Sequence, residues 1–326
     1  MSTDRRSQPP PIALDPSLFE ASAVDAETRQ ANALLEQLLA STPSVLEVPA
    51  REVRAARAEG RSFAGPVVRS PNAVDRCIEG PAGPLPLRVF APPGARGVLL
   101  HIHGGGWALG AHDLQDPLLE ALSTAARIAV VSVGYRLAPE HPYPAANDDC
   151  EAAALWLARN ARAEFGTDRL MIGGESAGAH LSVTTMLRLR DRHDLRPFVA
   201  AGLTYGAFDL GFTPSALCWG TRNLVLSTPI MRRFIEWYAP PDLRDPDASP
   251  LHGDLRGLPP ALFSVGTLDP LLDDTLFMAS RWIAAGNAGE LAVYPGGVHG
   301  FNALPTALAR RANGRLMEFI DRHAGH

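Results

Sequence analysis

Apolar segments alternate with amphipathic segments along most of the chain. Short apolar runs of strand length are followed by longer segments with apolar residues at helical spacing. The predicted strands are 85–92, 98–103, 128–135, 169–174, 198–205, 261–266 and 290–295, and the helices after them are 148–162, 177–192, 273–286 and 307–323. Buried strands that alternate with helices indicate a mostly parallel sheet with helices on both faces. The pattern therefore predicts an α/β fold.

Two parts of the chain depart from this alternation. Residues 25–40 and 48–60 carry the spacing of two N-terminal helices, before the first predicted strand. Residues 208–250 are rich in proline and contain Trp219, Phe234, Trp237 and Tyr238. A long interruption of a regular fold is usually functional, so we expect this insertion to lie over the C-terminal edge of the sheet. The predicted organisation is N-terminal helices at 1–60, a core at 61–207 and 251–326, and the insertion at 208–250.

The amino-acid composition excludes several classes of function. The net charge is −5, and every basic residue is an arginine that lies outside any basic block. Nucleic acid is therefore not an expected partner. The lack of lysine excludes a Walker A loop and a Schiff-base lysine. The chain has no run of 18 apolar residues and no apolar stretch of signal-peptide type near residue 1, so we expect no membrane span and a cytoplasmic protein.

The three cysteines, Cys77, Cys150 and Cys218, are scattered along the chain. An odd number without close pairs indicates neither a disulfide framework nor a zinc site. We expect all three to be buried or half-buried apolar side chains.

The sequence "GGESAG", residues 173–178, stands where a predicted strand gives way to a predicted helix. A G-x-S-x-G match alone is modest evidence, but this junction is the context that a nucleophile elbow requires. The turn is tight, so side chains at Gly174 or Gly178 would collide with neighbouring backbone. It presents the hydroxyl of Ser176 and directs the amide of Ala177, at a helix N-terminus, toward developing negative charge.

A serine nucleophile needs a base, and the base needs an acid to orient it. Among the downstream histidines, His299 follows a predicted strand and lies in a glycine-rich loop before the last helix. Asp269 directly follows the preceding strand and is the predicted acid, with Asp273 as the reserve candidate. Helix capping would account for Asp273 and Asp274, which start the next helix.

The segment "HIHGGGWALG", residues 101–110, contains a glycine run at the end of the strand predicted at 98–103. Three successive glycines allow several backbone amides to point into one space, as an oxyanion hole requires. A dinucleotide-binding G-x-G-x-x-G does not fit, because position 109 is leucine. His101 and His103 lie on one strand face, but no third ligand follows at metal-site spacing. We therefore predict neither a cofactor nor a metal.

Taken together, these segments resemble the hormone-sensitive-lipase-like branch of the α/β-hydrolases, the bacterial family IV esterases. The matching motifs are "HGGGW" (103–107), "YRLAPEHPYPAA" (135–146), "GESAG" (174–178), "DPLLDD" (269–274) and "HGF" (299–301). They occur in the family's order from about residue 85 onward. As a set they are highly specific.

The resemblance implies an α/β-hydrolase fold with a helical cap, built from the N-terminal helices and the 208–250 insertion. It implies a cofactor-free serine carboxylesterase that acts on small, short-chain esters, with Ser176 as nucleophile, Asp269 as acid and His299 as base. It assigns the oxyanion donors to the amides of Gly105, Gly106 and Ala177. Similar proteins commonly form homodimers.

The sequence departs from the family in two places. Glu175 stands where the nearest branch usually has aspartate, and "TYGAFDL" (204–210) stands where Tyr-Pro is frequent. In the 135–146 segment we expect a structural ion pair between Arg136 and Glu140. Asp149 would cap the following helix.

Other functions stay open at this stage. The same triad would serve an acyltransferase, or an amide or acetyl hydrolase that acts on a natural product. A non-catalytic small-molecule binder is a further alternative, since one receptor group of the superfamily lacks a complete triad. The aromatic residues of the insertion suggest an apolar substrate pocket.

Overall fold

The computed structural model of the protein describes residues 14–42, 44–62 and 65–325. In this part of the chain, one eight-stranded sheet forms the centre of the molecule, in the order β1-β2-β4-β3-β5-β6-β7-β8. The strands are β1 (Val74–Gly80), β2 (Gly83–Phe90), β3 (Val98–Ile102), β4 (Ala129–Val133), β5 (Leu170–Glu175), β6 (Phe198–Thr204), β7 (Ala261–Leu268) and β8 (Gly289–Val298). The strands from β4 to β8 in this order pair in parallel, whereas β2 runs antiparallel to both neighbours.

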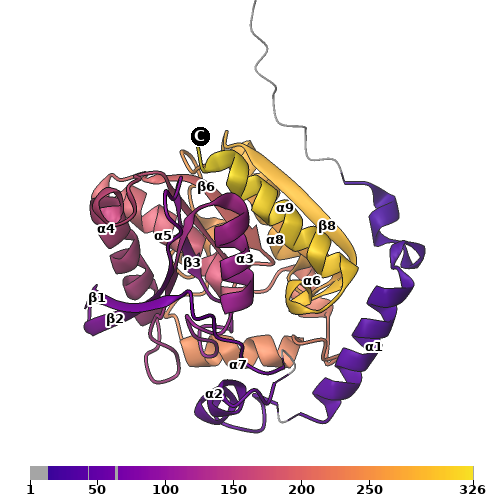
Figure 1. Ribbon diagram of the computed structural model, residues 1–326. Coiled ribbons are helices and arrows are strands. Elements are labelled where there is room, and N and C mark those ends of the chain that lie inside the picture. The colour runs from indigo at the N-terminus through magenta and orange to yellow at the C-terminus, as the bar shows by residue number, and fades with distance from the viewer. Residues whose placement is uncertain (1–13, 43, 63–64, 326) are drawn as a thin grey trace, which may run out of the picture.

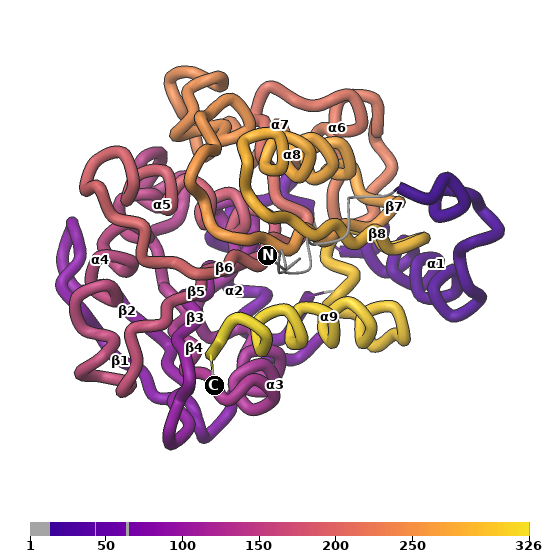
Figure 2. Tube along the Cα trace, turned by 90° about the horizontal axis from the view of Figure 1, so that it is seen from above, coloured from indigo at the N-terminus to yellow at the C-terminus, as the bar shows by residue number. Residues whose placement is uncertain are grey.

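Helices cover both faces of this sheet. The α-helices of the described residues are α1 (Ala26–Ala40), α2 (Ala50–Ala58), α3 (Asp116–Ala126), α4 (Ala145–Phe165), α5 (Ala177–His193), α6 (Pro214–Cys218), α7 (Thr228–Tyr238), α8 (Leu272–Ala284) and α9 (Ala307–His323). Figure 2 shows α3 and α9 on one side of the strands, and α4, α5 and α8 on the other. The α/β prediction and the expected mostly parallel sheet are confirmed.

The core is divided into two apolar layers by the sheet. Leu100 and Ile172 pack with α4, α5 and α8, while their neighbours Leu99 and Met171 pack with α3 and α9. Successive residues of a strand point to opposite faces, so a sheet buried on both faces needs apolar residues at every position. This requirement explains the continuous apolar runs from which the strands were predicted.

The structure adds one strand that the apolar pattern did not predict. β1 pairs with β2 at the edge of the sheet, and the first four residues of β1 are exposed. An edge strand that faces solvent needs no apolar run, so its polar sequence "VDRCIEG" reads as a loop.

The two N-terminal helices lie in different places. α1 runs along the side of the core, where it contacts β8 and α9, and Asn32 donates a hydrogen bond of 2.8 Å to the Gly296 carbonyl. α2 lies at the end of the sheet where α7 also lies (Figure 1). The extent of the cap stays a prediction.

Three expectations about side chains were wrong. Cys150 is buried, but Cys77 and Cys218 are exposed. Arg136 does not pair with Glu140 but forms a two-pronged ion pair with Asp149, with N–O distances of 2.9–3.1 Å. Asp149 lies within the second turn of α4 rather than at its cap, which brings its carboxylate to the loop that carries Arg136. Glu140 is engaged by Arg54 of α2.

Candidate active site

The GESAG segment forms a strained turn between β5 and α5. Ser176 adopts φ 57° and ψ −120°, and the residues on either side belong to the strand and the helix. A Cβ atom on Gly174 or Gly178 would lie 2.0 or 1.9 Å from the Ile102 carbonyl oxygen. Backbone cannot yield to such a contact, so both positions require glycine, as predicted. Packing of the turn against β3 lifts the Ser176 hydroxyl above the sheet edge.

Three side chains from three loops form one hydrogen-bonded chain. Ser176 Oγ lies 2.9 Å from His299 Nε2, and His299 Nδ1 lies 2.9 Å from Asp269 Oδ2. The three residues directly follow β5, β8 and β7, respectively, so the carboxyl ends of these strands bring them together. A carboxylate only accepts hydrogen bonds, so Nδ1 carries the proton and Nε2 is left to accept from the serine hydroxyl.

The carboxylate at the end of this series of hydrogen bonds is deeply buried. Asp269 is 1% exposed, and its Oδ1 also accepts a hydrogen bond of 2.9 Å from the Leu271 amide. The reserve candidate, Asp273, lies away from the imidazole and accepts from the Ser215 amide at 2.8 Å. The structure thus brings Asp269, and not Asp273, to His299.

Asp274 has a structural role that helix capping did not anticipate. It is fully buried and accepts hydrogen bonds from the amides of Phe208 and Asp209 and from the Thr213 hydroxyl, at 2.6–2.9 Å. Burial raises the pKa of Asp274 to about 7, and these hydrogen bonds oppose the rise. Asp274 therefore ties α8 to the first residues of the 208–250 segment.

The glycine loop after β3 borders the same space as the serine. Gly105 and Gly106 have φ values of 124° and 59°, and both residues line one cavity with Ser176 and Ala177. A Cβ on Gly105 would lie 2.3 Å from the Leu109 carbonyl oxygen, and one on Gly106 would lie 2.4 Å from the Phe234 ring. Ala177 is the first residue of α5, so its amide has no acceptor within the helix. The arrangement can supply several amides to a negatively charged oxygen.

His101 and His103 support the backbone beneath this loop. His101 lies between the Ser132 hydroxyl, at 3.0 Å, and the Glu175 carboxylate, at 3.2 Å. His103 stacks on Tyr135, and burial is the main cause that lowers the His103 pKa to about 3. In the described ranges, no group of three or more His, Cys, Asp or Glu side chains could hold a metal ion.

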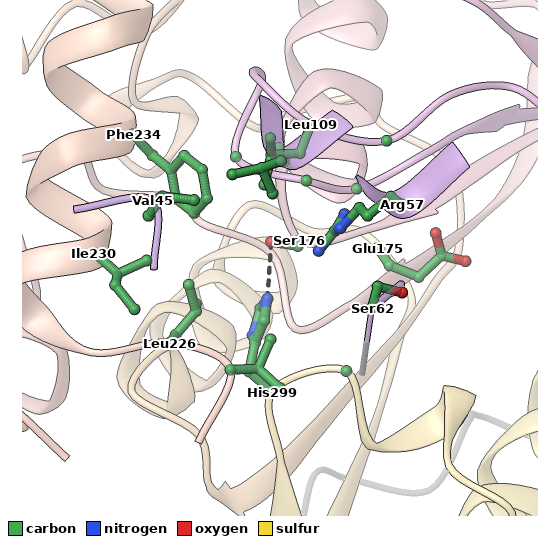
Figure 3. A pocket seen from close by; sticks show the side chains of 18 of the residues that line it. Val45, Arg57, Ser62, Leu109, Glu175, Ser176, Leu226, Ile230, Phe234 and His299 are labelled. Carbon is green, nitrogen blue, oxygen red and sulfur yellow. Dashed lines mark hydrogen bonds between the residues drawn. The ribbon is translucent and has the colours of Figure 1, made fainter. Parts of the chain in front are cut away.

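The unusual Glu175 has a defined place in this arrangement. Its carboxylate is turned away from Ser176 (Figure 3) and engages His101 inside the protein. The longer side chain of Glu175 therefore makes a buried contact with His101 beneath the turn, and the serine hydroxyl stays accessible.

His180 links the glycine loop to the end of the 208–250 insertion. It is fully buried, accepts a hydrogen bond from the Trp107 indole at 3.1 Å and donates to the Ala248 carbonyl at 2.8 Å. Burial lowers the His180 pKa to about 4, against 6.5 for the unperturbed side chain. The folded protein therefore holds this imidazole neutral across mildly acidic pH.

We expect His180 to make the free energy of unfolding fall as the pH decreases from about 6.5 toward 4, because the unfolded chain binds a proton that folded His180 does not. The raised pKa of Asp274 acts in the opposite direction, so the contribution of His180 is the difference in slope from a control that keeps Asp274. The shift corresponds to about 3 kcal/mol for this residue. Urea unfolding at a series of pH values measures the slope. In a His180→Gln control, whose amide can replace both hydrogen bonds, the slope should be shallower. Identical slopes in both proteins would contradict this role.

A cavity of about 860 Å³ opens above the serine. Val45, Leu226, Ile230 and Phe234 lie on one side of Ser176 in Figure 3, while Arg57 lies on the other. Of the four aromatic residues expected to form an apolar pocket, Phe234 lines the cavity and Tyr238 instead stacks on Trp107. The wall residues from the N-terminal segment, Val45 and Arg57 among them, were missed by the sequence analysis.

No helix in the described ranges is both long and apolar enough to cross a membrane.

Comparisons with known proteins agree with this geometry. Residues 99–303 match the model of a family described as having the alpha/beta hydrolase fold. Carboxylesterase NlhH of Mycobacterium tuberculosis is 38% identical over 251 residues, which cover 73% of this chain and 78% of NlhH. The carboxylic ester hydrolase LipN of the same organism is 37% identical over 289 residues, covering 81% of this chain and 75% of LipN.

A solved structure gives the same result for the fold. The hyperthermophilic esterase from the archaeon Pyrobaculum calidifontis superposes with a TM-score of 0.82 at 29% identity, covering 90% of this chain and 97% of that one. The chain therefore belongs to the α/β-hydrolase family, within its hormone-sensitive-lipase-like branch of carboxylic ester hydrolases.

Proposed function

We propose that this carboxylesterase cleaves short-chain esters through an acyl-enzyme on Ser176, with His299 as the base and Asp269 as the acid. The observation that carries the proposal is the hydrogen-bonded chain from Asp269 to Ser176, which ends at the cavity. It provides a nucleophile, a proton acceptor and a buried anion that orients the acceptor.

In the first half-reaction, His299 takes the proton of Ser176 as the oxygen attacks the ester carbonyl. The carbonyl oxygen becomes an oxyanion, which the amides of Gly105, Gly106 and Ala177 stabilise. The C–O bond to the alcohol then breaks, and the alcohol leaves with the proton from His299. Water repeats these steps on the acyl-enzyme and releases the acid.

The cap is part of this proposal. We propose that residues 14–42 and 44–60 of the predicted N-terminal cap segment, together with the segment 208–250, cover the active site; residues 1–13 and 43 of that prediction lie outside the described residues. Three contacts support it: Arg54 of α2 donates to the Ala108 carbonyl at 2.8 Å, Phe234 of α7 packs on Gly106, and Glu36 of α1 pairs with Arg222. The cap would limit the length of the acyl chain because it closes over the cavity.

Hydrolysis of p-nitrophenyl esters with acyl chains of two to sixteen carbons tests the function. We expect the largest kcat/KM among the short chains and a steep fall toward sixteen carbons, because a cavity of about 860 Å³ has limited room for methylene groups. Matched amides and an added alcohol acceptor should give little cleavage and little transfer. Turnover confined to amides, or dominated by transfer, would contradict the proposal.

A cytoplasmic location and a homodimer, both expected from the sequence and the resemblance, remain proposals. Fractionation of the native cells and sedimentation of the purified protein test them separately.

A further inference from the structure

The wall of the cavity is chemically two-sided. The labelled side chains of Val45, Leu226, Ile230 and Phe234 lie to one side of Ser176 in Figure 3. Arg57 projects from the opposite side toward Ser176. An ester bound at the serine must direct one of its two substituents to each side. The apolar side suits an alkyl group, and the opposite side carries a permanent positive charge.

The helix α2 directs Arg57 inward. Val53, Ala56, Arg57 and Gly60 all line the cavity, at the spacing of one helix face. Arg54, three residues earlier, fixes the rotation of this helix through the Ala108 carbonyl and the Glu140 carboxylate. Arg57 thus faces the cavity from α2, together with Glu52, Val53 and Ala56.

The positive charge of Arg57 contributes to the electrostatics of the active site. Burial lowers the pKa of Arg57 itself, although an arginine stays protonated at any working pH. Burial is also the main cause of the lowered His103 pKa, to which the charge of Arg57 adds. Arg57 lines the same cavity as His103, Gly105 and Ser176, so the guanidinium borders the space in which the ester carbonyl would bind. A partly desolvated cation interacts more strongly with an anionic ligand than an exposed one does.

Two carboxylates that share the cavity wall already have other partners. Glu175 engages His101, and Asp209 accepts from the Gly211 amide at 2.8 Å and lies 3.3 Å from His252. Glu52 is on α2 and is exposed.

We propose that the preferred substrates are esters that carry a carboxylate on one side of the ester bond and an alkyl group on the other, with Arg57 binding the carboxylate. Arg57 is then a specificity-determining residue. This inference rests on the proposed function, because it assumes that the ester binds at Ser176. A guanidinium and a carboxylate form paired, charge-assisted hydrogen bonds, whose loss should cost about tenfold to a hundredfold in kcat/KM.

Two pairs of matched esters test the inference. Butyl hydrogen succinate carries its carboxylate on the acyl side, and butyl 4-methylpentanoate replaces that group by an isopropyl group of similar shape. On the alcohol side, 3-butanoyloxypropanoate is matched by 3-methylbutyl butanoate. The acid released is titrated at constant pH. The measured quantity is the ratio of kcat/KM for the charged ester to kcat/KM for its neutral match.

We expect this ratio to exceed one in the wild type for at least one pair, and the responding pair identifies the side that meets Arg57. Arg57→Gln should lower that ratio at least tenfold, and Arg57→Lys should restore part of it. Arg51→Gln removes an exposed charge from the same helix and should leave the ratio unchanged. Thermal unfolding of each variant shows that it is folded.

The result that would overturn the inference is a wild-type ratio at or below one for both pairs. An equal loss of activity on charged and neutral esters in Arg57→Gln would also overturn it, since that result assigns Arg57 to the reaction or to the cap rather than to selectivity. Hydrolysis of neither neutral ester by the wild type would instead contradict the proposed function.

Discussion

Replacement of Ser176 by alanine is expected to lower kcat for ester hydrolysis by about five to six orders of magnitude. The variant loses the oxygen that lies 2.9 Å from His299 Nε2, so no acyl-enzyme can form. The positive φ of 57° is equally strained for serine and alanine, and the hydroxyl is only partly buried. The melting temperature should therefore change little. Steady-state kinetics with a short-chain p-nitrophenyl ester, together with thermal unfolding, measure both effects.

Covalent labelling separates loss of the nucleophile from loss of the site. A fluorophosphonate should add one mass increment to the wild type at Ser176 and none to Ser176→Ala. Ser182→Ala is the matched control, because this hydroxyl lies on α5, the helix that follows Ser176, and donates to the Gly178 carbonyl. It should retain labelling and most of the activity. Label on Ser176→Ala, or a normal burst of released alcohol, would contradict the assignment.

The sequence predicted the core of the fold because the sheet is buried on both faces. Residues 98–103 and 169–174 are largely apolar, with apolar side chains on both faces of the sheet, so they stand out as strands, and the structure places β3 and β5 there. The same reasoning fails at β1, whose residues mostly face solvent. An exposed edge strand is specified by its pairing with β2 rather than by its own composition.

The candidate site was predictable where each residue directly follows a strand. Ser176, Asp269 and His299 all occupy such positions, so topology alone brings them to one edge. The partners of ordinary charged residues were not predictable. Arg136 pairs with Asp149 rather than with Glu140, which is closer in the sequence. The reason is that the first turns of α4 face the loop of Arg136, and Arg54 of α2 pairs with Glu140.

The residues of the cavity wall were even harder to predict from the sequence. Leu226 and Phe234 come from the 208–250 segment and Arg57 from α2, far away in the chain, and their meeting at one cavity depends on how α2 and α7 pack. Periodicity identifies the inward face of α2 only after its rotation is fixed, and the contacts of Arg54 fix it. Mechanism could therefore be predicted from local motifs, whereas substrate selectivity depends on tertiary packing.

Replacement of Asp269 by asparagine is expected to lower kcat by about four orders of magnitude while the fold is kept. The Leu271 amide should hold the asparagine oxygen at the place of Oδ1, which turns the NH₂ group toward His299 Nδ1. An NH₂ group donates, so Nδ1 must accept and the ring proton moves to Nε2. In that tautomer the imidazole cannot take the proton of Ser176. The magnitude follows the equivalent substitution in a serine protease.

A second acid from the same helix start provides the control. Asp273→Asn keeps an acceptor for the Ser215 amide and lies away from His299, so it should retain most of the wild-type kcat. Both variants should unfold near the wild-type temperature, because asparagine preserves the shape of each site. A kcat near the wild-type value in Asp269→Asn would show that the buried carboxylate does not set the tautomer of His299. A large loss in Asp273→Asn would instead transfer that role to Asp273.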